Sequence, residues 1–186
     1  LNKYIRIIDG QKLTIGNLTW LAISDFGHSS EHISLYNEEK SLLISGDMIL
    51  PKIITHIGVY PDEPDGNPLD AFLKSLLKFK FLSKEALVLP SHAEPFGGSL
   101  QGRIMDRIKQ LNEHHKSRIR KILLNCKSEK TAYELLPHIF SRELDTHHFF
   151  FAFCELVAHL NYGWYQKLLR RTDQKGIIKF TTINRD

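Results

Sequence analysis

The first hundred residues alternate short apolar runs with polar or glycine-containing breaks, which is the pattern of strands joined by tight turns. Residues 3–8, 12–15 and 17–24 are rich in β-branched and aromatic side chains, and the sequences DG and IGN separate them. Runs of this kind predict strands. Two further runs, ISLY at 33–36 and SLLISGD at 41–47, are joined by NEEK and predict a hairpin.

A helix and a returning strand follow these runs. The YPDEPDG sequence predicts an irregular loop. A helix is then predicted over about 67–80. Asn67 is a good N-cap, Pro68 fits the first helical turn, and Asp70 complements the helix dipole. The run ALVLPSH at 86–92 predicts a buried strand that ends in a histidine. The order of elements therefore predicts an α/β layer for residues 1–101.

The hydrophobic period changes after the EPFGG sequence at 94–98. Side chains three or four residues apart predict a long amphipathic helix (Ile104, Ile108, Leu111, His115, Ile119 and Ile122). Thr131 and Glu134 have the spacing of a capping box for a second helix. We expect Pro137 to kink that helix or to end it early.

A third helix, rich in phenylalanine, is predicted to run to about Tyr162. The sequence LLRRTDQKGIIKFT at 168–181 then reads as two strands around a glycine turn. Three helices followed by a basic hairpin outline a winged-helix domain over residues 102–186, which would be mainly helical.

Charge separates the two halves of the chain. The net charge is +4, with −3 in residues 1–100 and +7 in residues 101–186. A basic half can bind nucleic acid or another polyanion, although an ordinary solvated helical surface has the same composition. The hydrophobic content of 42% is enough for a real core.

Composition also bears on the cellular compartment. No apolar run reaches the roughly 18 to 20 residues that cross a bilayer, and the first residues lack a signal-peptide layout. We therefore expect no membrane association. Cys126 and Cys154 have no metal-type or redox spacing, so we expect reduced core residues in a cytoplasmic protein. The chain lacks an initiator methionine, and we expect it to begin inside a longer protein.

Three polar residues share a position just past a predicted strand. His28 follows the run at 17–24, Asp47 ends the second hairpin strand, and His92 ends the strand at 86–92. Loops past strand ends are where α/β layers place functional groups. Two imidazoles and a carboxylate are suitable ligands for Zn²⁺ or a similar divalent ion. A purely structural role for each histidine is the alternative.

The sequences DFGHSSEHISLY, LLISGDMIL and LVLPSHAEPF, in this order and spacing, resemble the second half of the metallo-β-lactamase fold. That superfamily includes glyoxalase II and a group of single-stranded endoribonucleases. The resemblance implies an α/β fold, namely the second half of an αββα sandwich, over residues 1–101. It also implies that a winged-helix domain follows over residues 102–186, as in some relatives.

The resemblance implies a dinuclear metal site. His28 would be a ligand of the first metal, Asp47 the carboxylate that bridges both metals, and His92 a ligand of the second. Zinc is the expected ion, with manganese or iron as alternatives. The parent protein would be a hydrolase that uses metal-bound hydroxide on an ester, thioester, amide or phosphodiester.

One departure from the family pattern is severe. The main signature of the superfamily, His-x-His-x-Asp-His, is made by none of the ten histidines of this sequence. That motif would supply the remaining ligands, and the catalytic base is expected in the same absent N-terminal half. We therefore expect this chain to hold about half of a dinuclear site and to be inactive alone.

Further residues have less specific roles. In the resembling family the position of His32 supports the site, here by orienting a ligand through a hydrogen bond, and a hydrogen-bonded turn residue is the alternative. His56 could face the substrate. Arg170, Arg171 and Lys175 on the predicted hairpin could bind phosphates, or could protect a hairpin edge from aggregation.

Two other functions remain open. One is an endoribonuclease whose basic winged helix binds RNA, which aromatic side chains interleaved with the basic ones would favour (Trp164, Tyr165 and Phe180 are candidates). The other is a truncated interaction module with no catalytic role. The expected partners are a small-molecule ester or thioester, or RNA. Because the run at 17–24 is apolar on both faces, we also expect a homo-oligomer or association with the absent half.

Overall fold

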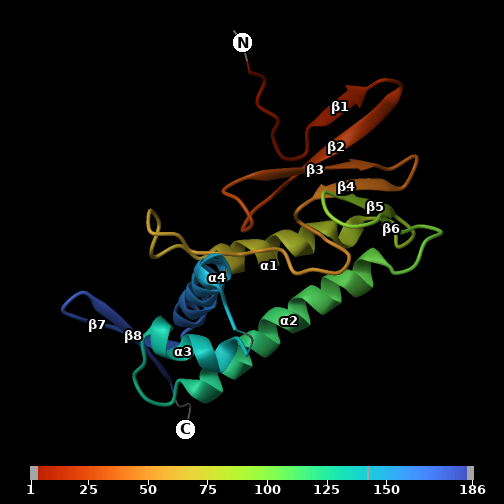
Figure 1. Ribbon diagram of the computed structural model, residues 1–186. Helices are drawn as coiled ribbons and strands as arrows, with labels where there is room; N and C mark the ends of the chain where they lie inside the picture. Colours follow the sequence, from red (N-terminus) through yellow and green to blue (C-terminus); the bar gives the residue numbers. More distant parts are fainter. Residues whose placement is uncertain (1–3, 142, 184–186) are drawn as a thin grey trace. The chain divides into compact units, whose positions relative to one another are not determined.

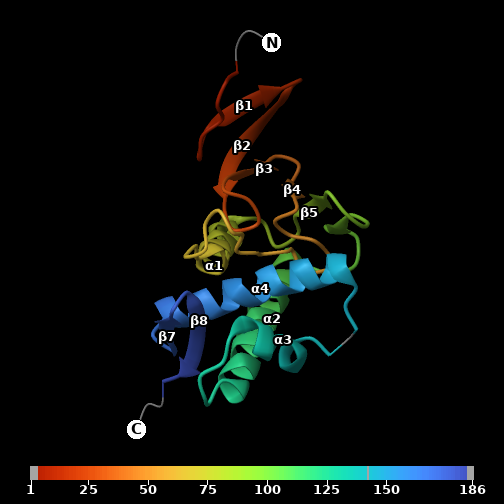
Figure 2. The same ribbon diagram turned by 60° about the vertical axis from the view of Figure 1, so that its left-hand side comes forward.

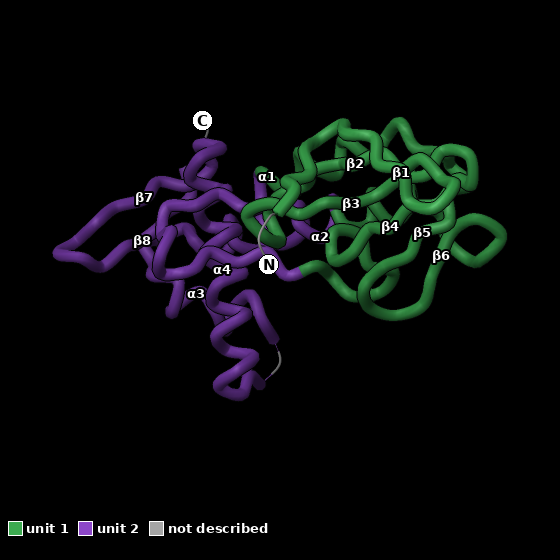
Figure 3. Tube along the Cα trace, turned by 90° about the horizontal axis from the view of Figure 1, so that it is seen from above, with its two compact units in different colours: residues 1–55, 71–111 green, residues 56–70, 112–186 purple. Residues whose placement is uncertain are grey.

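The computed structural model describes residues 4–141 and 143–183 (Figure 1). The chain forms two compact units (Figure 3). The sheet unit comprises residues 1–55 and 71–111, and the helical unit comprises residues 56–70 and 112–186. The predicted domain boundary between residues 101 and 102 stays a prediction.

The sheet unit contains one mixed sheet of six strands in sequence order. The strands are β1 (Lys12–Ile15), β2 (Leu18–Asp25), β3 (His32–Asn37), β4 (Leu42–Gly46), β5 (Leu87–Pro90) and β6 (Phe96–Gly97). All neighbours pair antiparallel except β4 and β5, which are parallel. The crossover between these two includes α1 (Pro68–Lys78) and a 3₁₀ turn (Phe79–Phe81). The α/β layer, the hairpin and the helix predicted near 67–80 are confirmed.

The prediction of a strand at 3–8 is wrong for residues 4–8, and Lys3 lies outside the described residues. Residues 4–8 are in no strand, and the side chains of Tyr4 and Ile5 are 86% and 87% exposed. A β-rich composition favours an extended chain, but a strand also needs a partner for its backbone groups. The sheet begins instead at β1.

The register of the sheet separates its two faces. Leu21, Tyr36, Leu43 and Val88 are cross-strand neighbours on one face. The part of α1 in the sheet unit lies along this face (Figure 1), and the Ser75 hydroxyl of α1 accepts a hydrogen bond from the backbone N–H that follows β2, at 2.9 Å. Helix and sheet therefore bury these side chains together.

The opposite face of the sheet is also apolar. It carries side chains that are half-buried or exposed (Ile15, Ile33, Leu35, Leu42, Ile44, Leu87 and Leu89). Ile15 and Ile44 are 52% and 38% exposed. The prediction that β2 is apolar on both faces is confirmed, because Trp20 and Ile23 point to opposite sides and both are buried.

The helical unit contains the C-terminal part of α2 (Ile104–Asn125), α3 (Ala132–Ile139), α4 (Thr146–Tyr165) and a hairpin of β7 (Leu169–Gln174) and β8 (Ile177–Thr182), as Figure 2 shows. The capping box of Thr131 and Glu134 is present, and α3 ends two residues after Pro137. Both predictions are confirmed. The winged-helix assignment for residues 102–186 stays a prediction.

The core of the helical unit includes residues from all of its elements, among them Ile122, Leu135, Leu156, Leu169 and Phe180. Cys126 and Cys154 are free and buried, as expected. Among the described residues, no helix combines the length and the apolarity that a membrane crossing requires.

A pair of histidines is buried in the helical unit. His115 on α2 and His159 on α4 are 1% and 0% exposed. His159 Nδ1 lies 2.8 Å from the Glu155 carbonyl oxygen, which can only accept, so Nδ1 carries the proton. His159 Nε2 is then an acceptor for the Nδ1–H of His115, 3.1 Å away. This arrangement requires the His159 ring to be neutral, and burial disfavours a charge on the His115 ring.

Burial lowers the pKa of His115 to about 2 and the pKa of His159 to about 3. In the unfolded chain both rings would titrate near the ordinary histidine value of about 6.5. Below that pH the unfolded chain binds protons that the folded chain does not. The contribution of this pair to the free energy of unfolding is therefore fully present above about pH 6.5, and it is lost progressively as the pH falls below that value.

We predict that the chain loses stability steeply between about pH 6.5 and pH 5, by up to about 2.7 kcal/mol per pH unit from this pair. Replacing both His115 and His159 with Gln should flatten the pH dependence of the melting temperature. His138→Gln, at an exposed position, is the control and should keep the steep slope. Equal slopes for the double variant and the parent chain would contradict the prediction.

Candidate functional site

The three residues predicted at strand ends lie at one edge of the sheet. Strands β2 and β4 are both antiparallel to β3 and so run in the same direction, and β5 is parallel to β4. The carboxyl ends of these three strands therefore meet at the same edge. His28, Asp47 and His92 follow them by three, one and two residues.

The carboxylate of Asp47 lies between two imidazoles. Its Oδ2 is 3.5 Å from His28 Nε2, and its Oδ1 is 3.3 Å from His92 Nε2. The side chains of His28 and Asp47 are about one-third exposed and that of His92 is 63% exposed. The structure thus brings the three residues together, with each histidine next to a different oxygen of the same carboxylate.

The position of Asp47 is held by neighbouring hydroxyl groups. Ser91 Oγ donates to Asp47 Oδ1 at 2.5 Å, and Thr55 Oγ1 donates to the Asp47 carbonyl oxygen at 2.6 Å. Ala93, directly after His92, has a φ of 65°. A residue other than glycine in this region of backbone space carries strain, which is frequent at functional sites.

His32 lies beside this edge without touching the Asp47 carboxylate in any described hydrogen bond. Its Nδ1–H donates to Asp25 Oδ1 at 2.8 Å, and Ser34 Oγ donates to Asp25 Oδ2 at 2.7 Å. The hydrogen bond to Asp25 raises the pKa of His32, although partial burial acts in the opposite direction. Asp25 is 1% exposed, so its carboxylate fixes the ring.

The other ring nitrogen of His32 packs against the backbone of β4. A Cβ atom placed on Gly46 would lie 2.3 Å from His32 Nε2, and Gly46 has a φ of 50°. Only glycine satisfies both conditions without strain. His32 therefore supports the backbone directly before Asp47, and its predicted effect on a ligand side chain stays a prediction.

The donor atoms are of the kinds that bind metal ions, but they are fewer than one metal site normally has. Two ligands of one tetrahedral zinc ion, each about 2.0 to 2.2 Å from the metal, lie about 3.3 to 3.5 Å apart. The two distances from Asp47 to the imidazoles have this size. Among residues 4–141 and 143–183, however, no group of three or more His, Cys, Asp or Glu side chains could hold a metal ion.

Sequence reasoning did not identify Asp25, Ser91 or Thr55. The signal for Asp25 is its place in β2, because the two-residue period puts it on the same face as Leu21 and Ile23. A carboxylate on a face that is otherwise apolar needs buried donors. No comparable sequence signal marks Ser91 or Thr55, whose hydroxyl contacts depend on how two loops fold back.

His56 lies in the helical unit, where its ring meets Phe151 edge-on with the ring centroids 4.9 Å apart and Tyr60 at 6.3 Å. Further exposed aromatic side chains, Phe150 and His147, continue this group. Its predicted role toward a substrate stays a prediction.

The basic residues of the hairpin differ in their surroundings. Arg170 and Lys175 are exposed. The Arg171 side chain is only 16% exposed, since it pairs with Asp65 at 2.6 Å and lies over the Trp164 ring at 4.5 Å. Phe180 is buried in the core. Of the aromatic candidates for stacking on bases, only Tyr165 is largely exposed, at 49%.

Comparisons with known proteins match both parts of the chain. Residues 1–92 match the metallo-β-lactamase superfamily, and residues 119–183 match the metallo-β-lactamase-like C-terminal domain. A β-lactamase-like protein 2 homolog from Caenorhabditis elegans is 27% identical over 123 residues, which are 66% of this chain and 37% of that protein.

Two solved structures cover 98% of this chain. A β-lactamase domain protein from Burkholderia ambifaria is 37% identical with a TM-score of 0.91, and this chain covers 53% of it. A metallo-β-lactamase family protein from Thermus thermophilus is 26% identical with a TM-score of 0.82, and 55% of it is covered. The chain thus spans about half the length of these structures, and its two parts match domain models of the metallo-β-lactamase superfamily.

The contact between His32 and Gly46 gives a prediction about stability. Gly46→Ala should destabilise the chain by about 1 to 2 kcal/mol for the positive φ, and by a further roughly 1 to 3 kcal/mol because His32 must move. Gly16 has a φ of 61° and no atom within 4 Å of an added Cβ. Gly16→Ala should therefore show the first cost alone in a urea titration. Equal losses in the two variants would show that His32 is not held against Gly46.

Proposed function

We propose that this chain, with its metallo-β-lactamase superfamily domains, is the C-terminal portion of a dinuclear zinc-dependent hydrolase. The single observation that carries the proposal is the Asp47 carboxylate, which has one histidine imidazole beside each of its oxygens. A carboxylate placed in this way is suited to bridge two cations. The substrate bond is an ester, thioester, amide or phosphodiester.

Each residue has a distinct role in the proposal. His28 and Asp47 would hold the first metal ion, and His92 and Asp47 would hold the second. When bound, such ions supply the activation of water, because they lower its pKa toward neutrality. Ser91 and Thr55 orient Asp47, and the pair of His32 and Asp25 fixes the backbone before it, as the hydrogen bonds and the Gly46 contact support.

The 186 residues alone are proposed to be inactive. The motif His-x-His-x-Asp-His does not occur in them, and two protein ligands per ion are fewer than the three or four that zinc sites normally have. The remaining ligands and the base would come from another polypeptide segment. The sequence that precedes Leu1 in the gene would show whether such a segment is encoded there.

The endoribonuclease alternative draws on the basic hairpin. It gains little support from the side chains there, because Arg171 is engaged with Asp65 and Trp164, and Phe180 is buried. Arg170 and Lys175 remain exposed for phosphate contacts. A non-catalytic interaction module is the third candidate. It gives no reason for the placement of His28 and His92 beside the two oxygens of Asp47.

The apolar face of the sheet opposite α1, called the outer face below, is proposed as the surface through which the isolated chain associates with a second copy. Its seven exposed or half-buried aliphatic side chains come from β1, β3, β4 and β5. Contiguous patches beyond a few hundred Å² are unusual on soluble monomers. Burial of apolar surface stabilises an association by roughly 25 cal/mol per Å², so covering this face with a second copy is favourable.

We predict that the dialysed chain retains well under one zinc ion, as measured by elemental analysis, since no ion has more than two protein ligands. Added zinc should still shift the ring-nitrogen NMR signals of His28 and His92 together. Asp47→Asn should remove both shifts, because both histidines share that carboxylate. His138→Gln is the control. Tight stoichiometric zinc, or shifts that survive Asp47→Asn, would contradict the proposed ligand set.

We further predict that the purified chain is a homodimer or larger species at micromolar concentration. Ile44→Lys, in the centre of the outer face, should shift the mass measured by light scattering toward the monomer. Leu77→Lys changes a side chain of the sheet unit that is 51% exposed on α1 and should leave the mass unchanged. A parent chain that is monodisperse, cooperatively folded and monomeric would refute the association.

A further inference from the structure

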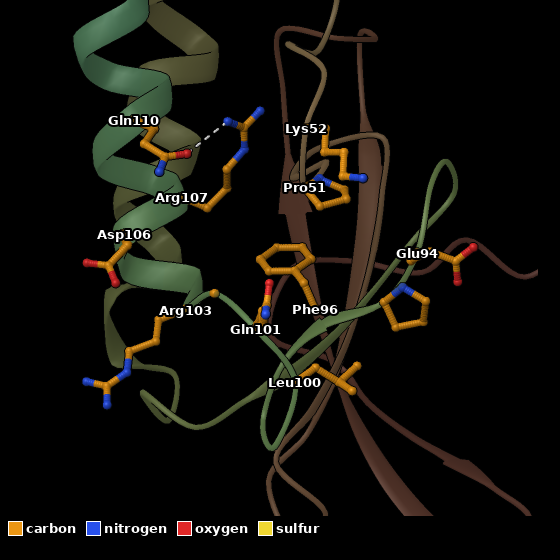
Figure 4. Close-up of a pocket in the computed structure, with 12 residues that line it drawn as sticks. Pro51, Lys52, Glu94, Phe96, Leu100, Gln101, Arg103, Asp106, Arg107 and Gln110 are labelled. Atoms are coloured by element: carbon orange, nitrogen blue, oxygen red, sulfur yellow. Dashed lines mark hydrogen bonds between the residues drawn. The ribbon is translucent and has the colours of Figure 1, made fainter.

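A cavity of about 580 Å³ lies within the sheet unit, beside the first turns of α2. Its walls come from α2, from the loop after β4 and from the segment around β6, as Figure 4 shows. The volume is in the range of about 300 to 1,000 Å³ that is typical of small-molecule sites.

Arg107 on α2 forms the inner wall of this cavity and is 8% exposed. Its guanidinium donates to the carbonyl oxygens of Leu50 at 2.6 Å and Ile53 at 2.7 Å, and to Gln110 Oε1 at 3.1 Å. All three acceptors are uncharged. In the described part of the chain no carboxylate pairs with Arg107, and the adjacent Asp106 projects away from its guanidinium (Figure 4).

A buried positive charge with neutral acceptors alone is only partly compensated. Burial accordingly lowers the pKa of Arg107, although an arginine remains protonated. Arginine has five N–H groups, and the three hydrogen bonds use three of them. Among the described residues, the other two N–H groups of Arg107 therefore have no hydrogen-bond partner and remain for a ligand.

The remainder of the wall is mixed in character. Lys52 and Arg103 are exposed lining residues that add positive charge, and Glu94 and Asp106 are exposed carboxylates among the same lining residues. Phe96 and Leu100 provide an apolar surface, and the Phe96 ring faces the middle of the cavity in Figure 4. A ligand that matches both parts has an acidic group and an apolar body.

We propose that this cavity binds a small organic anion, whose carboxylate or phosphate group is held by Arg107 and Lys52 and whose apolar part lies against Phe96 and Leu100. The proposal goes beyond the hydrolase function and does not depend on bound metal. A competing explanation gives Arg107 only the task of pinning the loop of residues 50–53, and the experiment separates the two.

The test uses the ¹⁵N-labelled full chain and three probes of equal chain length. These are octanoate, octyl phosphate and octylamine. We expect the two anions to shift the backbone amide signals of Lys52, Phe96 and Leu100 in a saturable way, and octylamine to leave them unchanged. Tighter binding of octyl phosphate than of octanoate would assign the site to phosphates, and the reverse order to carboxylates.

Variants then locate the charge. Lys52→Ala should raise the dissociation constant about threefold or more, and Arg107→Gln about tenfold or more, because charge-assisted hydrogen bonds are lost. Lys84→Ala changes an exposed lysine of the same unit outside the cavity and should have no effect. If Arg107→Gln does not fold, Leu100→Trp replaces it. The larger tryptophan side chain narrows the cavity and should weaken the binding of both anions.

Three results would overturn the proposal. One is equal binding of octylamine, which would show a purely apolar site. Another is an anion affinity that changes neither in Lys52→Ala nor in the second variant, which is Arg107→Gln if it folds and Leu100→Trp otherwise. That result would mean that Arg107 only holds the loop of residues 50–53 in place. The third is the absence of saturable shifts at the cavity, including the case in which the anions perturb only the outer sheet face around Leu35 and Ile44.

Discussion

The candidate site depends on the common direction of three strands of the sheet. Because β2, β4 and β5 run the same way, their carboxyl ends share one edge of the sheet, and the residues that follow them converge. Asp47 is the centre of that convergence, with His28 and His92 beside its two oxygens. A single carboxylate thereby joins three segments that are far apart in the sequence.

The buried carboxylate of Asp25 holds the backbone at this edge of the sheet in place. Asp25 accepts hydrogen bonds from His32 and Ser34, and the fixed His32 ring fills the space that a side chain on Gly46 would need. The backbone before Asp47 therefore has little freedom, which is how enzymes preorganise a ligand or a charged group. Function at the edge and packing below it are thus coupled through the strand β4.

The hydrophobic period predicted most of the elements, because strands at 12–15 and 17–24 and the helix from Asn67 have strong local signals. It failed at residues 4–8, where pairing with a neighbour decides and composition does not. The site could be predicted as far as its strand-end residues, His28, Asp47 and His92. The roles of Asp25, Ser91 and Arg107 depend on contacts between distant segments, which no local pattern encodes.

The most direct test of the shared carboxylate is anomalous diffraction at the zinc absorption edge from crystals of the chain soaked in zinc. Our account predicts anomalous density beside Asp47, next to His28 Nε2, next to His92 Nε2, or at both places. Zinc density confined to other histidines, such as His147 and His148, with none beside Asp47, would contradict it.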